Sequence, residues 1–117
     1  MTRWIKPVHP GTILLEDFLE PTGMSRSALA KAIGVPAPRV NDVVLCRRGI
    51  TADTAMRLAA FIGTTPEFWI NLQASYELDV ARQKADLIES VGKIEPYRAE
   101  AGPDRFQRSA GGGAGPV

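Results

Sequence analysis

The sequence predicts an all-α domain built from short helices, and three observations support this fold class. Apolar residues recur at helical spacing, and no stretch alternates apolar and polar residues as a half-buried strand would. Prolines and glycines separate the apolar segments into short pieces. A chain of 117 residues that is 44% hydrophobic suits a single globular domain. Because no short helix can hide its apolar stripe alone, the helices must share one core.

The composition excludes several classes of protein. No apolar run approaches the roughly 20 residues that span a bilayer, and the N-terminus lacks the apolar core of a signal peptide. We therefore expect a cytoplasmic protein. The single cysteine, Cys46, excludes an internal disulfide and a cysteine-cluster zinc site, and it is expected to be inert. Lone His9, without a partner at metal-ligand spacing, is interpreted as a helix-start or surface residue.

No arrangement of catalytic residues stands out in the sequence. Paired carboxylates, a Ser/His/Asp set and a glycine-rich phosphate loop are all missing from the pattern. We therefore predict a protein that is not an enzyme and that needs no metal or cofactor.

A first helix is predicted over residues 11–19. Pro10 suits its first turn, because a first-turn N–H has no partner within the helix. Pro21 and Gly23 are expected to end it. Its buried face is formed by the apolar residues Leu14, Leu15, Phe18 and Leu19.

Two further helices are predicted over residues 26–33 and 37–45. Ser25 is a preferred N-cap residue, and Gly34 suits the left-handed conformation that follows a helix end. A helix, a tight turn and a second helix form the helix-turn-helix pattern, whose second helix enters the major groove of DNA. On this spacing alone, simple packing of two helices is an equal alternative.

The helix predicted over residues 37–45 has one apolar side and one polar side. Pro36 and Pro38 are tolerated at its beginning, because first-turn N–H groups have no intrahelical partner to lose. Its core-facing side carries Val40, Val43 and Val44. The candidates for reading bases are Ala37, Pro38, Arg39, Asn41 and Asp42. Arginine pairs with guanine, asparagine with adenine, and small apolar groups contact thymine methyls, while an aspartate accepts from cytosine or orients a neighbouring arginine.

Residues that suit phosphate contacts bracket the same helix. The net charge of the chain is only +1, but residues 39–48 carry three arginines against one aspartate. Such a local basic face attracts phosphate at short range. The candidates are Ser25, Arg26, Arg47, Arg48 and Thr51. For the pair Arg47 and Arg48, a solvated loop without a ligand is the alternative interpretation.

Capping signals place the later helices. A fourth helix is predicted between the N-cap residue Thr51 and Gly63, and a fifth after the N-cap residue Thr65, with Pro66 in its first turn. A sixth helix is predicted over about residues 76–89. The predicted organisation is an N-terminal arm (1–9), a compact five-helix unit (10–75), a C-terminal helical segment (76–95) and a flexible tail (96–117).

The fifth and sixth helices are predicted to carry more apolar surface than five small helices can cover. Exposed apolar patches of this kind mark association sites. We therefore predict a homodimer, with interface residues Trp69, Ile70 and Leu72.

Three segments carry a resemblance to a known family. They are "HPG" followed by "LEDFLEP", then "RRGITADTAMRLA", and then "GTTPEFWINLQ". Over residues 9 to about 78 the chain closely resembles the HigA antitoxins of bacterial toxin–antitoxin modules, also called VapI-type proteins. These belong to the XRE group of helix-turn-helix proteins, which includes Cro and the phage repressors. The resemblance implies a five-helix domain like that of the lambda repressor.

The resemblance also implies a function. Proteins of this family neutralise a HigB toxin, an mRNA-cleaving ribonuclease of the RelE type, and they repress their own operon as dimers on a palindromic operator. By position, Ser25 and Arg26 match the phosphate-contacting start of a helix, and Arg47 and Arg48 match the basic loop that follows the reading helix.

One departure from the family pattern falls in that loop. Family members commonly have "NGKRGIT" where this chain has "LCRRGIT", so Leu45 and Cys46 replace an Asn–Gly turn. Glycine and asparagine adopt positive φ most easily. The reading helix is therefore expected either to run a turn longer or to end with strain.

Alternatives to the full antitoxin function stay open at this point. A toxin-neutralising module without operator binding and a stand-alone transcription regulator both fit the residues. Glu16, Asp17 and Glu20 form an acidic patch that suits a basic toxin. An ordinary solvated helix face explains the same patch equally well.

Overall fold

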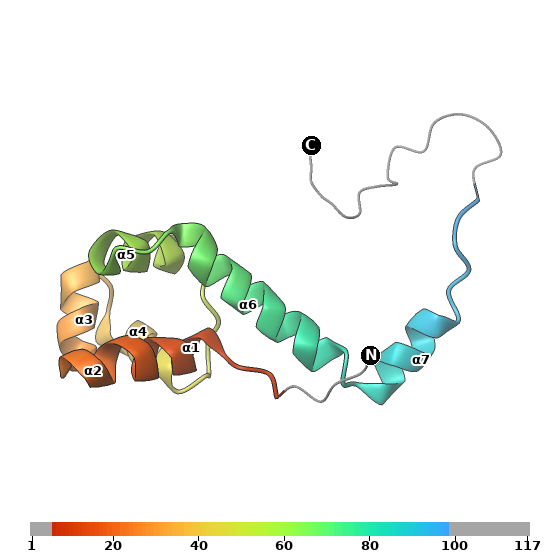
Figure 1. Ribbon diagram of the computed structural model, residues 1–117, viewed down its shortest axis with the longest axis horizontal. Helices are drawn as coiled ribbons and strands as arrows, with labels where there is room; N and C mark the ends of the chain where they lie inside the picture. The colour runs from red at the N-terminus through yellow and green to blue at the C-terminus, as the bar shows by residue number, and fades with distance from the viewer. Residues whose placement is uncertain (1–5, 99–117) are drawn as a thin grey trace.

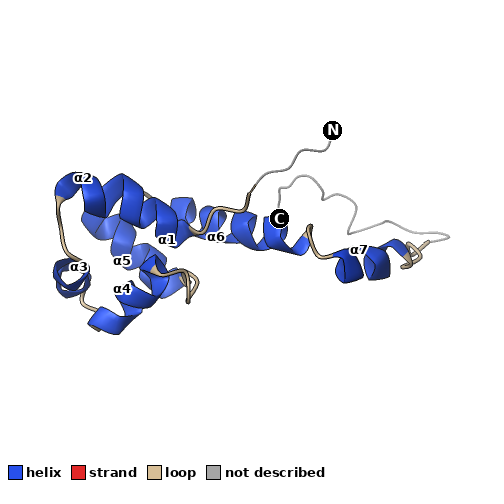
Figure 2. Ribbon diagram, turned by 90° about the horizontal axis from the view of Figure 1, so that it is seen from below, coloured by secondary structure: helices blue, strands red, loops and turns tan. Residues whose placement is uncertain are grey.

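The computed structural model describes residues 6–98, and every regular element in this part of the chain is a helix (Figures 1 and 2). The predicted all-α fold class is confirmed. The predicted tail over residues 96–117 lies, from residue 99 onward, outside the described residues. The elements are α1 (Pro10–Ile13), η1 (Leu14–Leu19), α2 (Glu20–Thr22), α3 (Arg26–Ile33), α4 (Ala37–Val44), α5 (Ala52–Ile62), α6 (Pro66–Ala81) and α7 (Ala85–Gly92).

The segments α1, η1 and α2 follow one another without a break, so this first helical stretch is longer than predicted. Pro21 does not end it, because the stretch continues through α2 to Gly23, whose φ is +73°. The middle segment η1 is π-helical, and the N–H of Glu20 donates to the carbonyl of Leu15, five residues back. This wider turn comes where the ring of Pro21 would otherwise meet the carbonyl of Asp17.

The boundaries of α3 and α5 follow the predicted caps. The hydroxyl of Ser25 accepts from the N–H of Ala28 at 3.0 Å, and the hydroxyl of Thr51 accepts from the N–H of Thr54 at 3.4 Å. Each helix ends at a glycine with positive φ, Gly34 at +74° and Gly63 at +98°. The first turn of each helix therefore has a side-chain acceptor for one of its unpaired N–H groups.

The predicted boundary between a fifth and a sixth helix near residue 75 is wrong. Helix α6 runs unbroken through Ala81, and α7 begins at Ala85. Residues 67–81 contain no proline or glycine, so nothing stops the helix. The helix is interrupted instead at residues 82–84. There the N–H groups of Gln83 and Lys84 donate to the carbonyls three residues back, those of Val80 and Ala81.

The core lies between α1, η1 and helices α3 to α6. Val40, Val43 and Val44 of α4 are buried, as their spacing predicts. Trp69 is 2% exposed, and its Nε1 donates to the hydroxyl of Thr64 at 2.7 Å. Burying a side chain of the valine or leucine type contributes about 1.5–3 kcal/mol, so these residues hold α4 firmly against the body of the protein.

Gly11 allows α1 to approach α4 directly. A Cβ atom at this position would overlap the carbonyl oxygen of Val43. Just before it, Nδ1 of His9 accepts from the N–H of Gly11 at 2.9 Å and caps α1. His9 is thus at the helix start, one of the two positions that the sequence predicts, but it is buried. Its ring packs edge-on against that of Tyr76, with 4.9 Å between the ring centroids.

The C-terminal part of the described chain extends away from the other helices. Figures 1 and 2 both show α7 beyond the far end of α6, separated from α1 to α5. Residues 82–98 are all exposed. In the described part of the chain, no helix combines the length and the apolar character needed to cross a membrane.

Candidate nucleic-acid interface

Helices α3 and α4 are joined by a three-residue turn that fixes their relative position. Gly34 adopts positive φ, and the N–H of Val35 donates to the carbonyl of Ala30 at 3.0 Å. Pro36 then stands in extended conformation immediately before α4, with ψ of 145°. Pro38 lies in the first turn of α4, where its missing N–H leaves no intrahelical bond unmade. The two prolines therefore occupy the positions that their sequence context predicts.

The structure brings the five predicted base-reading residues together on the solvent side of α4. Ala37 and Pro38 are exposed, whereas Arg39, Asn41 and Asp42 are half-buried. A shallow groove joins this side of α4 to the beginning of α3. It is lined by Ser25, Arg26, Ser27, Ala37, Pro38 and Asn41. Candidates for phosphate contact and for base contact therefore share one surface.

Asn41 and Arg26 are bonded to each other across this groove. Nη1 of Arg26 donates to Oδ1 of Asn41 at 2.7 Å. Because a guanidinium has no acceptor, the bond fixes which way the amide points and leaves its NH₂ group turned away from Arg26. The amide oxygen has a second lone pair, so Asn41 retains both a donor and an acceptor for an adenine edge.

Asp42 lies between the two arginines of the following loop. Arg47 Nη1 and Arg48 Nη2 each lie 3.9 Å from a carboxylate oxygen of Asp42. Their charges offset the negative charge that Asp42 would otherwise present to a phosphate. Both arginines remain exposed, so their guanidinium groups are accessible to a nucleic-acid backbone.

Arg39 is paired with an acidic residue in the first turn of α5. Its Nη1 donates to Oδ1 of Asp53 on α5 at 3.0 Å, and the same oxygen accepts from Nε of Arg57 at 2.7 Å. The hydrogen bond from Arg57, reinforced by the charges of Arg57 and Arg39, lowers the pKa of Asp53 below its usual value. The spacing of Asp53 and Arg57 by four residues is a signal that could have found this pair, but the contact with Arg39 is visible only in the fold.

The turn after α4 resolves the question raised by Leu45 and Cys46. Helix α4 ends at Val44, and Cys46 has φ of +62°, the one positive value outside glycine in the described residues. The N–H of Cys46 donates to the carbonyl of Val43 at 2.9 Å, and the N–H of Arg47 to that of Asp42 at 2.8 Å. This pair of bonds is the Schellman motif, which normally places glycine at the left-handed position. The helix therefore does not run a turn longer, and its end places a non-glycine residue in the unfavourable region.

The remaining phosphate candidates already have structural roles. The hydroxyl oxygens of Ser25 and Thr51 accept the capping bonds of α3 and α5. The hydroxyl proton of Ser25 is a donor that could serve a phosphate oxygen, whereas the hydroxyl of Thr51 donates to that of Thr54 at 3.4 Å. Ser25 lines the groove with Arg26, whereas Thr51 lies at the beginning of α5.

The predicted dimer-interface residues fall into different environments. Trp69 is a core residue of its own chain, and so it is not available to a partner. Leu72 is half-buried against that core, and Ile70 is exposed. The sequence pattern does not distinguish these cases, because all three are apolar residues on one short stretch of helix.

The helix pair, its tight turn and the exposed polar side of α4 define a helix-turn-helix domain. A helix-turn-helix family model matches residues 15–69. The chain is 44% identical to virulence-associated protein I of Dichelobacter nodosus, over 80% of this chain and 84% of that protein. It is 43% identical to antitoxin HigA-1 of Vibrio cholerae, over 62% of this chain and 69% of that protein.

Solved structures agree with these relatives. The structure of the Pseudomonas aeruginosa antitoxin HigA with the higBA promoter matches with a TM-score of 0.73 and 45% sequence identity, over 78% of this chain and 98% of that chain. The protein therefore belongs to the helix-turn-helix family of the HigA antitoxins and virulence-associated protein I. The family resemblance identified from the sequence is confirmed.

Proposed function

We propose that this protein is the antitoxin of a type II toxin–antitoxin module and represses its own operon. It would bind and neutralise an mRNA-cleaving toxin of the HigB/RelE type in the cytoplasm. One observation carries the proposal: the side of α4 that bears Arg39, Asn41 and Asp42 faces solvent, in a chain 45% identical to an antitoxin solved with its promoter. The proposal assigns binding to the protein and no catalytic step.

In this proposal α4 enters the major groove of the operator. Arg39 pairs with guanine and Asn41 with adenine, while Asp42 accepts from cytosine or orients a neighbouring arginine. Ala37 and Pro38 contact thymine methyl groups. Ser25, Arg26, Arg47, Arg48 and Thr51 contact phosphates, and these contacts position the protein without reading sequence.

A second copy of the chain would cover the apolar side chains that the C-terminal helices expose. Ile70 and Leu78 lie on one side of α6, eight residues apart, and both are exposed. On α7, Leu87, Ile88 and Val91 form a stripe that is 41–54% exposed. A two-fold dimer through these helices would set two copies of α4 about 34 Å apart, which is one turn of DNA. We retain Ile70 and Leu72 as interface candidates.

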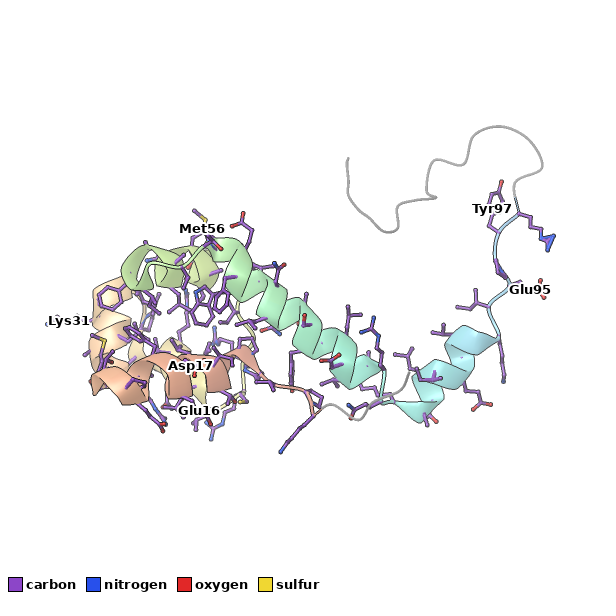
Figure 3. The ribbon with its side chains drawn as sticks, in the orientation of Figure 1. Glu16, Asp17, Lys31, Met56, Glu95 and Tyr97 are labelled. Carbon is purple, nitrogen blue, oxygen red and sulfur yellow. The ribbon has the colours of Figure 1, made fainter. Side chains whose placement is uncertain are left out.

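The toxin-binding surface is the second part of the proposal. Glu16 and Asp17 lie on the solvent side of η1 (Figure 3), and Glu20 follows on α2. A patch of three exposed carboxylates is complementary to a basic, RNA-binding toxin.

Two measurements test the proposal. Purified protein should shift the DNA upstream of its own gene in a gel assay, and it should co-purify with the product of the adjacent gene. DNA binding without a co-purifying toxin would instead indicate a stand-alone regulator. Toxin binding without a DNA shift would indicate a neutralising module alone.

Substitutions separate base reading from phosphate contact. Arg39→Ala should reduce the preference for operator by about 10- to 100-fold, because it removes a base contact. Arg48→Ala should weaken binding to all DNA sequences about equally. It should also reduce the slope of log affinity against log salt concentration by about one. Intact sequence-specific binding by Arg39→Ala would contradict the assignment of α4 as the reading helix.

A further inference from the structure

Arg57 fixes helix α5 to the turn between α3 and α4. Its Nη1 donates to the carbonyl oxygen of Ile33 at 2.9 Å and to that of Gly34 at 3.3 Å. These carbonyls stand at the C-terminal end of α3, where a helix leaves such groups without partners. A Cβ at Gly34 would lie 3.2 Å from the same guanidinium nitrogen, so the arginine lies close against the turn. One side chain of α5 thus satisfies part of the helix-turn-helix backbone.

Asp53 connects this arginine to the reading helix. It lies one helical turn before Arg57, and its Oδ1 accepts from both Arg57 and Arg39, at 2.7 and 3.0 Å. An isolated ion pair between exposed side chains would hold Arg39 only weakly. Here the carboxylate is held in turn by Arg57, which is fixed on two backbone carbonyls. The three side chains therefore form a network that runs from the end of α3, through α5, to α4.

Arg39 keeps its capacity to bind DNA within this network. A guanidinium has five N–H donors, and the bond to Asp53 uses Nη1 alone. The side chain of Arg39 is 31% exposed, so it has been drawn toward α5 without being removed from solvent. The carboxylate therefore restricts the direction of the guanidinium while leaving donors for a guanine edge.

We propose that Asp53 is a positioning residue for operator reading, which selects a base through Arg39 without touching DNA. This inference rests on the proposed function, because it takes Arg39 to be a base-reading residue. A competing role for Asp53 is that of a latch, which holds Arg39 back from DNA until the two separate. The two roles predict opposite effects of removing the carboxylate charge on the preference for operator.

Asp53→Asn separates the two roles, and Glu67→Gln is the matched control. Each substitution removes one negative charge from the exposed first turn of a helix, Asp53 from α5 and Glu67 from α6. Of these two carboxylates, Asp53 is the one that accepts from Arg39. The full-length variants are titrated by fluorescence anisotropy with the upstream duplex and with a scrambled duplex of equal length. The measured quantity is the ratio of the two affinities. Thermal melts of all variants report whether the fold is retained.

The positioning role predicts that Asp53→Asn lowers this ratio by about tenfold, the size of one good base contact. Affinity for scrambled DNA should stay equal or rise, because a negative charge near the phosphates has been removed. Glu67→Gln should keep the wild-type ratio. An unchanged or increased ratio for Asp53→Asn overturns the proposal, and an increase identifies the latch. Equal binding of both duplexes by the wild-type protein would overturn the proposed function itself.

A double-mutant cycle shows whether Asp53 acts through Arg39. In an Arg39→Ala background, adding Asp53→Asn should lower the ratio no further. An additional tenfold loss would show that Asp53 acts by another route and would overturn the proposal. If Asp53→Asn does not fold, Asp53→Glu keeps the charge but displaces the carboxylate by one methylene. Its ratio should fall between those of the wild type and the Arg39→Ala variant, and a wild-type ratio would overturn the proposal.

Discussion

The helical body (residues 9–76) and the C-terminal arm (residues 77–98) use their apolar residues in different ways. All of the buried apolar residues of the described chain lie in the body. In the arm, residues 82–98 are exposed throughout, including the apolar stripe of α7. The body is therefore stabilised by contacts within one chain. The arm has helices but no buried apolar residues of its own, and the proposed dimer would supply a core for it.

The largest difference in the free energy of unfolding should come from replacing one glycine by alanine in each region. Gly11→Ala places a Cβ against the carbonyl oxygen of Val43, and overpacking against backbone that cannot move away should cost about 3 kcal/mol. Gly92→Ala meets no atom of the described residues within 4 Å, and a helical alanine should add about 0.5–1 kcal/mol. Urea denaturation measures both changes. An equal loss at the two positions would contradict the distinction between body and arm.

The next largest effect is expected on dimerisation, and it concerns the arm alone. Ile88→Glu places a charge in the middle of the exposed stripe of α7, which is 50% exposed at this position in the single chain. Dimerisation should weaken by at least about tenfold, because burial of an isoleucine contributes about 1.5–3 kcal/mol. The unfolding of the body should not change. Analytical ultracentrifugation measures the dissociation constant, and Glu89→Gln, a neighbouring polar substitution, serves as the control.

A monomeric wild-type protein at micromolar concentration would contradict this dimer. If Ile88→Glu and Glu89→Gln had the same dissociation constant, the stripe of α7 would not be the contact surface. Either outcome would leave the body, with its helix-turn-helix, unaffected as a folded unit.

The sequence predicts the body better than the arm, because the body's boundaries are set by local signals. Ser25, Thr51 and Thr65 each cap the helix that follows them, and glycines with positive φ end α3 and α5. Each of these signals lies within four residues of the helix end that it sets, so it can be recognised in the sequence without knowledge of the fold. Helix α6 continues from the body into the arm, and residues 67–81 contain no proline or glycine, so no local signal supports the predicted boundary near residue 75.

The candidate site was predictable in its residues and not in its contacts. The alternation of valines with polar residues indicates which side of α4 faces solvent. It does not reveal that Arg39 meets Asp53, because these residues are brought together by the packing of α4 and α5. The burial of Trp69 likewise depends on the whole core, so residue type alone assigned it wrongly to an interface.

A smaller effect is expected at the end of α4, inside the body. Cys46→Gly relieves a left-handed conformation that costs roughly 1–2 kcal/mol for most residues, partly offset by the greater freedom of glycine in the unfolded chain. The net gain should be about 1 kcal/mol in the free energy of unfolding. Leu45→Gly is the matched control, because Leu45 has φ of −85° and should lose stability. A loss of stability in both variants would argue against strain at Cys46.

The smallest effect should come from His9, which joins the beginning of α1 to α6 through its contact with Tyr76. Burial lowers the pKa of His9 below 6.5, and its Nδ1 needs a free lone pair to cap α1. Below pH 6.5 the unfolded chain therefore binds a proton that the folded protein resists, and stability falls as the pH falls. The loss through this group is at most about 1.4 kcal/mol per pH unit. This loss of stability should be absent well above pH 6.5, where His9 is neutral in both the folded and the unfolded state.

His9→Asn isolates this contribution, because asparagine caps a helix without titrating. Urea midpoints are compared at pH 7.5 and pH 5.5 for the wild type and the variant. The wild type should lose more stability between these two pH values than the variant does, since carboxylates contribute equally to both. Parallel losses would show that His9 titrates normally in the fold. The contact between α1 and α6 would then be open to water, and the border between body and arm would lie closer to Trp69.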